Sequence, residues 1–440
     1  MPRKMRMLFA VVAIFLVVGS VTGAYAVGSF AAQMTGPLRI FTDSLAIIHS
    51  KYVEKLEPSE MVYSALEGML SRLDPHSAFL RPSAMKELEV DTRGKFEGLG
   101  IEITIRENYI LIISPIDGTP AAKAGLNPGD IIVKIDGEST RGITIFEAVK
   151  KLRGPAGSTV KIHIWRKGWT DPKEFPITRA PITVKVVRFR ELESGYGYVK
   201  LTQFNTTATR EMRKALTELE KMDGGVKGIV LDLRNNPGGL LDQAISVSDL
   251  FVDDGLIVYT RGRGSNMKFN AAATKTGTMT DVPIALLINA GSASASEIVA
   301  GCLQDQHRAI LIGERSFGKG SVQTIIPLPD GSGMKLTTAK YYTPDGRDIQ
   351  AKGIDPDLTV NGDTTDVAGD AHRKALREAD LDRHLEGAEE EKPSAKPDAP
   401  VAPLPTDEDG DKNKSEDPQL EMALKVLKAW PVFMKAASKN

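Results

Sequence analysis

The chain has 440 residues, 41% of them hydrophobic, which is enough for two or three domains with their own cores. Its 56 basic and 57 acidic side chains give a net charge of −1, so the composition indicates no nucleic-acid partner. Cys302 is the only cysteine, which excludes an intrachain disulfide and a multi-cysteine metal site. The six histidines show no metal-ligand spacing, so neither a metal nor a cofactor is expected.

Residues 1–28 have the pattern of a targeting segment. Three basic residues precede an apolar stretch at 7–18, and Ala24-Tyr25-Ala26 matches a signal-peptide cleavage site. Apolar and small residues continue to Gly28, close to the ~20 residues that a spanning helix needs, so an uncleaved membrane anchor also fits. Both interpretations predict export to the bacterial periplasm, and the second adds attachment to the inner membrane.

Two regions precede the larger predicted domain. Apolar residues at helical spacing predict two helices in 37–90, broken at Asp74-Pro75, and we expect them to form a packing or dimerisation arm. Residues 94–178 form a compact unit rich in β-formers. Its predicted strands are 101–105, 109–113, 130–135 and 158–165, with a helical turn at 121–125 and a short helix at 146–152.

Residues 180–360 alternate predicted strands with predicted helices. The strands are 197–201, 226–233, 284–288 and 309–312, and the helices are 207–222 and one that begins at Ala295. This rhythm favours an α/β fold with a largely parallel sheet and helices on its faces. The proline-rich, charged segment 387–417 predicts a linker, and apolar residues at three- and four-residue steps predict a last helix in 418–440.

Ser294 follows the apolar run 282–289 at a predicted strand-to-helix turn. Such a turn exposes a hydroxyl and presents the next backbone N–H at the positive end of a helix, which suits a nucleophile beside an oxyanion donor. The same residues, Ser294-x-x-Glu297, also fit a capping box, in which the hydroxyl only satisfies an N–H group. Ser292 and Ser296 flank Ser294 at alternate positions, so these residues alone leave the nucleophile open.

Lys319 lies farther along the chain between two glycines. Burial beside Phe317 and Val322 could lower its pKa by the ~3 units, from a free value of ~10.4, that a base at neutral pH requires. A solvated loop lysine is the plain alternative. The segment 313–319 also matches the phosphate-loop pattern G-x-x-x-x-G-K, with Asp232 as the acidic partner of magnesium, but Gly320 stands where that motif needs Ser or Thr.

Two glycine-rich turns are further candidates. The backbone N–H groups of the turn 234–239, Arg-Asn-Asn-Pro-Gly-Gly, suit the second half of an oxyanion hole, and an ordinary turn is the alternative. Those of Gly98-Leu99-Gly100-Ile101 can capture a chain-end carboxylate while the next strand edge pairs with a peptide. Asp305 and His307 could complete a triad with Ser294, but residues two apart on a helix point to nearly opposite sides.

Four motifs in this order, at 98–101, 234–239, 292–297 and 318–323, resemble the carboxyl-terminal processing proteases, the tail-specific Ser/Lys peptidases, over about residues 37–360. The resemblance implies a PDZ domain inserted before a peptidase core of the crotonase and Clp-protease type. It selects Ser294 as nucleophile, Lys319 as base and Gln323 as the residue that orients the lysine. The remaining implied residues are Ala295 and Gly238 as oxyanion donors, with Gly239 as the alternative to Gly238, and Leu99, Gly100, Ile101 and Arg153 in substrate binding.

The expected function is an exported serine endopeptidase that recognises the C-terminal ends of protein substrates through its PDZ domain. Its expected partners are those substrates, further copies of the same chain and an activating adaptor protein. Two other classes remain: a PDZ scaffold with a degenerate core, and a magnesium-dependent nucleotide-binding protein.

Overall fold

The computed structural model describes residues 33–193, 195–264, 268–278, 282–362, 376–387 and 417–437. These residues fall into two compact units that meet between Leu73 and Asp74, and each is described by itself. The predicted targeting segment and nearly all of the predicted linker lie outside the described residues. Within the described ranges, no helix combines the length and apolar character needed to cross a bilayer.

The first unit is a pair of helices, one over residues 33–51 and α2 (Pro58–Leu70). Phe41 and Ile48 of the first helix line an apolar pocket with Leu56 and Met61. Much apolar surface stays in contact with solvent, including Val53, which is 91% exposed. Exposed apolar surface of this kind is typical of a surface that binds another protein.

Both helices predicted before the break at Asp74-Pro75 are confirmed, and the range 37–90 also holds a third helix that the sequence analysis did not predict. After the break at Asp74-Pro75 come β1 (Ala78–Leu80) and α3 (Pro82–Arg93), both in the second unit. β1 pairs with β18 (Gly333–Tyr342), far along the chain, so the break marks a change of unit as well as the end of a helix.

The β-rich region forms an antiparallel sheet of order β3-β4-β5-β7-β8 with β6 paired to β5. Its elements are β3 (Ile101–Arg106), β4 (Tyr109–Pro115), α4 (Pro120–Lys123), β5 (Ile131–Ile135), β6 (Glu138–Ser139), α5 (Ile145–Leu152), β7 (Thr159–Trp165) and β8 (Lys173–Thr178). All the elements predicted here are confirmed, and alternate residues such as Ile110 and Ile112 fill the core. The chain enters and leaves through β2 (Lys95–Gly98) and β9 (Ala180–Thr183), which pair with each other.

The mostly parallel sheet has the order β10-β11-β12-β15-β16-β19, and all neighbours are parallel except β10 and β11. Its strands are β10 (Val187–Glu193), β11 (Tyr196–Leu201), β12 (Gly228–Asp232), β15 (Ile284–Ile288), β16 (Ala309–Gly313) and β19 (Leu358–Thr359). The predicted parallel strands are thus confirmed. They read as unbroken apolar runs because both faces of the sheet are covered.

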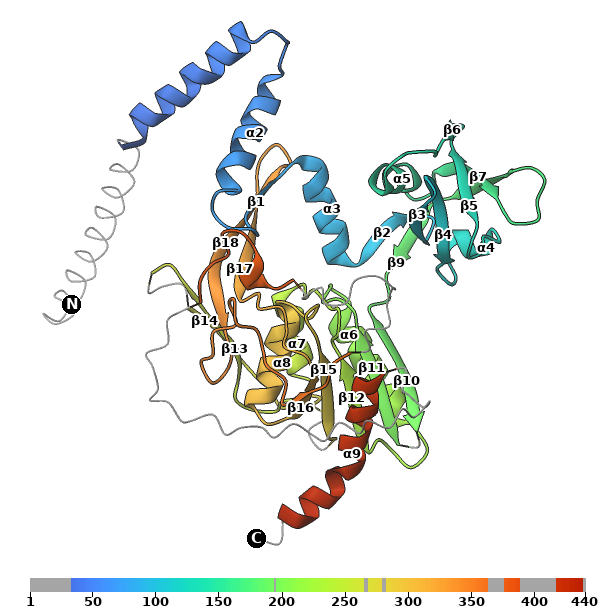
Figure 1. Ribbon diagram of the computed structural model, residues 1–440, viewed down its shortest axis with the longest axis vertical. Coiled ribbons are helices and arrows are strands. Elements are labelled where there is room, and N and C mark those ends of the chain that lie inside the picture. Colours follow the sequence, from blue (N-terminus) through green and yellow to red (C-terminus); the bar gives the residue numbers. More distant parts are fainter. Residues whose placement is uncertain are drawn as a thin grey trace, which may run out of the picture. The chain divides into compact units, whose positions relative to one another are not determined.

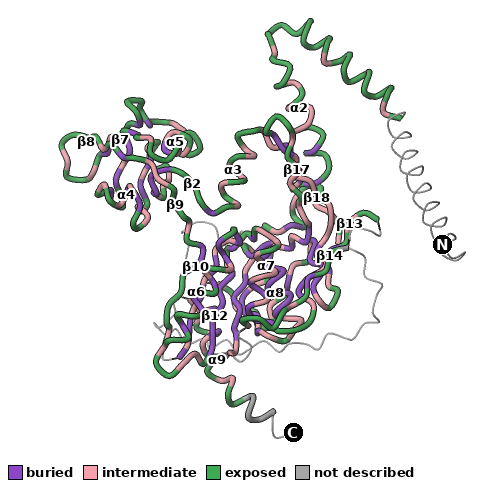
Figure 2. Tube along the Cα trace, turned by 180° about the vertical axis from the view of Figure 1, so that it is seen from behind, coloured by how far each residue is buried: buried purple, intermediate pink, exposed green. Residues whose placement is uncertain are grey.

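Helices cover the two faces of this sheet (Figure 1). Ile229, Leu231 and Leu286 point to one face and pack with α6 (Ala208–Glu220), α7 (Leu241–Ser248) and α8 (Ala295–Asp305). The residues between them point to the other face, where Ala423 and Leu427 of α9 (Pro418–Ala437) pack. Figure 2 shows this buried centre around β12, α7 and α8.

A second sheet, which the sequence analysis did not predict, has the order β1-β18-β13-β14, and β17 also pairs with β18. Its remaining strands are β13 (Leu256–Gly262), β14 (Lys268–Ala272) and β17 (Ser321–Pro327). β17 begins directly after the glycine-flanked lysine, so this sheet fixes one end of the loop that carries Lys319.

Candidate active site

Three loops that carry candidate residues leave neighbouring parallel strands at the same edge of the mostly parallel sheet. The turn 233–239 follows β12, the turn 289–294 follows β15, and the loop 314–320 follows β16. Parallel neighbours present their carboxyl ends together, so residues far apart in sequence meet there. The N–H of Phe317 donates to the carbonyl of Ser292 over 3.0 Å, which joins the last two loops directly.

The structure separates the three serines of 292–296. Ser292 and Ser296 are fully buried, and their hydroxyls donate to the carbonyls of Leu233 and Asn236 over 2.8 and 2.9 Å. Ser294 is partly exposed, and its hydroxyl has no hydrogen-bond partner among the described residues. Only Ser294 is therefore free to react.

Ser294 precedes α8 in an unusual backbone conformation, with φ 55° and ψ −112°. A non-glycine residue pays for such angles in strain, which is common where a side chain must be presented for function. Ser294 and Glu297 have the arrangement of a capping box, in which the Ser294 N–H donates to Glu297 Oε2 over 2.8 Å. The Glu297 N–H, however, donates to the Ser294 carbonyl over 2.9 Å, and no cap hydrogen bond to the Ser294 hydroxyl is formed. The hydroxyl is thus not consumed as a helix cap.

Glu297 is fully buried and accepts four hydrogen bonds. Ser316 Oγ and the Gly318 N–H donate to Oε1 over 2.5 and 2.7 Å, and the N–H groups of Ser294 and Lys319 donate to Oε2 over 2.8 and 2.9 Å. Burial raises the pKa of Glu297 to about 7, against these bonds, which favour the charged form. The sequence analysis gave Glu297 only a capping role; its position inside the apolar run 295–303 was the available sign of a buried acid.

Lys319 is partly buried, and its backbone N–H shares an acceptor with that of Ser294. Its amine has no hydrogen-bond or ion-pair partner among the described residues, so a hydrogen bond to the Ser294 hydroxyl is not formed in this structure. Burial is the main reason why the pKa of Lys319 lies below its ordinary value, and Lys335 lowers it further. The carboxylates of Glu378, Glu297 and Asp74 oppose this shift. A lysine in such surroundings loses its proton more readily than a solvated one, as a general base must.

The phosphate-loop interpretation is wrong on structural grounds. Such a loop places phosphate at the N-terminus of the helix that follows it. Here the segment 313–319 leads into strand β17, and the Gly320 N–H is bound to Gln350 Oε1 over 3.0 Å. Asp232, the proposed magnesium partner, is instead paired with Arg234.

Gln323 does not contact the lysine amine in the described part of the chain. Its Nε2 donates to Ser321 Oγ over 3.0 Å and to Thr337 Oγ1 over 3.3 Å. The contact between Gln323 and Lys319 implied by the resemblance is therefore not formed in this structure.

Of the predicted oxyanion donors, Ala295 has a free N–H and Gly238 does not. Gly238 lies against the serine turn, since a Cβ on it would be 2.9 Å from Ser294 Cβ, but its N–H donates to Asn236 Oδ1 over 2.9 Å. The N–H groups of Ala295 and Gly239 have no acceptor among the described residues. The structure thus favours Gly239, the alternative, over Gly238.

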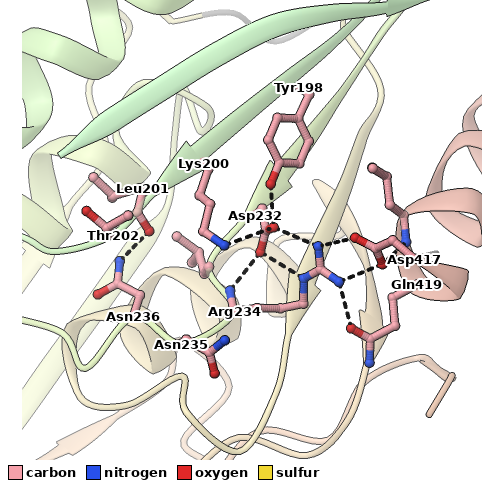
Figure 3. A network of polar contacts seen from close by, with 12 residues as sticks. Tyr198, Lys200, Leu201, Thr202, Asp232, Arg234, Asn235, Asn236, Asp417 and Gln419 are labelled. Atoms are coloured by element: carbon pink, nitrogen blue, oxygen red, sulfur yellow. Dashed lines mark hydrogen bonds and ion pairs between the residues drawn. The ribbon is translucent and has the colours of Figure 1, made fainter. Parts of the chain in front are cut away.

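A second polar network lies beside the glycine turn (Figure 3). Arg234 bridges Asp232 of β12 and Asp417 at the start of α9, with Nη2 2.8 Å from a carboxylate oxygen of each. Tyr198 and Gln419 complete it through bonds to Asp232 and Arg234. The network ties α9 to the strand end that carries the turn.

Asp305 and His307 do not form a triad with Ser294. Asp305 accepts hydrogen bonds from Arg347 Nη2 and from the Asp345 N–H. Asp305 and His307 line a pocket together with Trp430. The structure contradicts this candidate because the end of α8 lies a helix length from its start, where Ser294 is located.

In the β-rich unit, the segment 98–101 connects the end of β2 to the start of the edge strand β3. Gly100 has φ 77°, and a Cβ on it would be 2.4 Å from Thr119, so only glycine fits. The N–H groups of Leu99 and Gly100 have no acceptor in the described ranges, while Ile101 opens β3. Arg153 lies beside this loop, its guanidinium 5.0 Å from the ring centre of Phe96.

Comparisons with known proteins identify the family of the chain. Residues 195–360 match peptidase family S41, and residues 111–166 match the PDZ domain. A carboxy-terminal-processing protease of Bartonella bacilliformis is 43% identical over 429 residues, which covers 96% of both chains. A carboxyl-terminal-processing protease of Synechocystis sp. is 42% identical over 71% of this chain and 74% of its own. The solved structure of a photosystem II D1 C-terminal processing protease is 32% identical, with 73% of this chain and 92% of the other covered, at a TM-score of 0.44.

Proposed function

Because the chain belongs to the carboxy-terminal-processing proteases, serine-type enzymes with a PDZ domain, we propose that it is an exported endopeptidase with Ser294 as nucleophile and Lys319 as general base. One observation carries the pairing: the backbone N–H groups of both residues donate to the same oxygen of Glu297. That shared acceptor supports the pairing, because it holds the backbones of Ser294 and Lys319 close together.

The reaction follows from the groups present. Ser294 Oγ attacks the scissile carbonyl carbon while its proton passes to the neutral amine of Lys319. The Ala295 N–H and a glycine N–H of the 234–239 turn stabilise the oxyanion. The Lys319 ammonium then protonates the leaving amine as the C–N bond breaks. The neutral Lys319 amine next takes a proton from water, which attacks the acyl-enzyme and releases the acyl group.

Gln323 has an orienting role in this proposal. Its amide oxygen has no donor in the described part of the chain, and it can accept a hydrogen bond from the lysine amine after a side-chain rotation. The bonds to Ser321 and Thr337 hold the opposite end of the amide.

The PDZ domain supplies recognition. The two unoccupied N–H groups of Leu99 and Gly100 bind the substrate carboxylate, the open edge of β3, which begins at Ile101, pairs with the peptide, and Arg153 senses the bound end. The domain limits proposed from the sequence, 94–178 for the PDZ unit and 180–360 for the peptidase core, enclose the two matched ranges.

Export to the periplasm and anchoring through residues 1–28 remain part of the proposal, because they rest on the sequence of that segment. So do assembly with other copies and binding of an adaptor, which the exposed apolar surface of the helical arm supports.

The test is cleavage of an unfolded protein substrate with a free C-terminus by the full chain. We expect Ser294→Ala and Lys319→Ala each to abolish cleavage without changing the melting temperature by more than a few degrees. Full activity of Lys319→Ala would remove lysine from the mechanism. A scaffold would bind the substrate and leave it intact, and mass spectrometry of envelope proteins that change length in a Ser294→Ala strain would identify the natural substrates.

A further inference from the structure

The segment 376–387 lies beyond the residues that match the peptidase family, yet it packs on the loop that carries Lys319. Arg377 Nη1 donates to the carbonyls of Arg315 and Ser316 over 2.8 and 2.7 Å. The Glu378 N–H donates to the carbonyl of Phe317 over 3.1 Å. This tail segment therefore holds the loop that carries Lys319 through three hydrogen bonds.

Glu378 connects this contact to a longer chain of hydrogen bonds. Its carboxylate is fully buried, with His76 Nε2 2.8 Å from Oε2 and Gln350 Nε2 donating to Oε1 over 2.9 Å. Gln350 Oε1 in turn accepts from the Gly320 N–H over 3.0 Å. The chain thus runs from His76 through Glu378 and Gln350 to the residue directly after Lys319.

Two buried carboxylates consequently hold the loop that carries Lys319. Glu297 accepts from the N–H groups of Gly318 and Lys319, and Glu378, through Gln350, holds Gly320. A glycine is required at position 320 for this approach, because a Cβ would be 2.3 Å from the Gln350 nitrogen.

The charges around this chain bear on the amine as well as on the backbone. The groups that face Glu378 are His76 from the turn after Asp74 and Lys319 from the loop, and Lys335, Asp74 and Glu297 complete the charged groups around Lys319. Burial lowers the pKa of Lys319 most, while the negative charge of Glu378 opposes that shift.

We propose that Glu378 is a positioning residue for the peptidase reaction: with His76 and Gln350 it fixes the loop that carries Lys319 and places a negative charge beside the amine. This inference rests on the proposed function of Lys319 as the general base. It assigns a part in the reaction to the tail of the chain, beyond the four motifs of the family.

The experiment compares Glu378→Gln, Glu378→Ala and Lys319→Ala in the full chain, with Asp382→Asn as the matched control. Asp382 is an exposed carboxylate on the same segment, so its variant makes the same charge change away from the loop. The measurements are kcat and KM for a peptide with a free C-terminus between pH 5 and 10, and the melting temperature of each variant.

Glu378→Gln keeps an acceptor for Gln350 but loses the negative charge that raises the pKa of Lys319. That pKa therefore falls, and the acidic limb of the pH–rate profile moves to lower pH. Glu378→Ala loses the hydrogen bonds as well, and its kcat falls by about tenfold or more with KM little changed. Asp382→Asn has the wild-type profile. A merely structural role for Glu378 would lower the melting temperature and leave the limb where it is.

If the acidic limb of the pH–rate profile lies at the same pH in Glu378→Gln as in the wild type, the inference is overturned, whatever happens to kcat. If Glu378→Ala does not fold, Glu378→Gln still decides. Loss of activity in Lys319→Ala with an unshifted limb in Glu378→Gln would reject only the role of Glu378, whereas an active Lys319→Ala would reject the proposed function and this inference with it.

Discussion

The backbone N–H groups of Ser294 and Lys319 donate to the same atom, Oε2 of Glu297, over 2.8 and 2.9 Å. The two residues belong to different loops, and neither loop is fixed by its own sequence alone. Because the shared acceptor is buried, displacement of either backbone leaves a donor unsatisfied away from water. The positions of Ser294 and Lys319 are therefore linked.

Replacement of Glu297 by Gln should damage both stability and catalysis. Whichever way the new amide turns, its NH2 group faces donors that now bind a carboxylate oxygen. Buried donors left unsatisfied cost roughly 1–3 kcal/mol each, so we expect a loss of about 2 kcal/mol or more in the free energy of unfolding. Urea denaturation measures that loss, and kcat should fall at unchanged KM; a variant as stable and active as wild type would contradict the shared-acceptor account.

The strained backbone of Ser294 predicts a difference between two inactive variants. Glycine adopts φ 55° and ψ −112° without the strain that alanine has at these angles, which is of the order of 1 kcal/mol or more. Ser294→Gly should therefore unfold at higher denaturant concentration than Ser294→Ala, although both lack the hydroxyl. Equal stabilities would show that the turn is not strained.

The charge of Lys335 predicts a shift of the pH optimum. After burial, Lys335 is the next cause of the lowered pKa of Lys319, so Lys335→Gln raises that pKa. In the proposed mechanism Lys319 reacts as the neutral amine, so the acidic limb of the pH–rate profile moves to higher pH, opposite to the shift in Glu378→Gln. Lys185→Gln, an exposed position in the same unit, serves as the control; a limb that moves equally in both variants would reflect net charge alone.

The network at Arg234 predicts that replacing Arg234 costs more stability than replacing Asp417. Arg234→Met leaves the fully buried Asp232 without its main partner, which costs about 3–5 kcal/mol in the free energy of unfolding. Asp417→Asn removes a half-buried partner and leaves the pair of Arg234 with Asp232, at about 1 kcal/mol. Urea unfolding curves distinguish these values, and a larger loss in Asp417→Asn would show that the docking of α9 dominates.

Two glycines with nearly equal φ angles test the carboxylate-binding loop. Gly100→Ala places a Cβ 2.4 Å from Thr119, whereas Gly118→Ala, at φ 76°, meets no atom within 4 Å. Binding of a labelled peptide with a free C-terminus, followed by fluorescence anisotropy, should weaken by about tenfold or more only in Gly100→Ala. An amidated peptide should bind both variants and wild type equally weakly.

The sequence predicted four strands of the β-rich region and the four central strands of the mostly parallel sheet, because buried strands such as Ile284–Ile288 are short apolar runs between turn residues. It did not predict the sheet of β13, β14, β17 and β18. It also missed Glu297 as an organiser and gave no role to His76 or Glu378. Each of these depends on partners distant in the chain, which local periodicity does not report.

The sequence by itself determined the family, since four short motifs in fixed order specify turns at strand ends and the residue types that the chemistry needs. Tertiary structure decided which of three serines is free, how far Lys319 is buried, and which glycine N–H remains without an acceptor. The physical reason is that a side chain's hydrogen bonds and burial are set by the groups packed around it, and at this site those groups come from β12, β15, β16 and the tail.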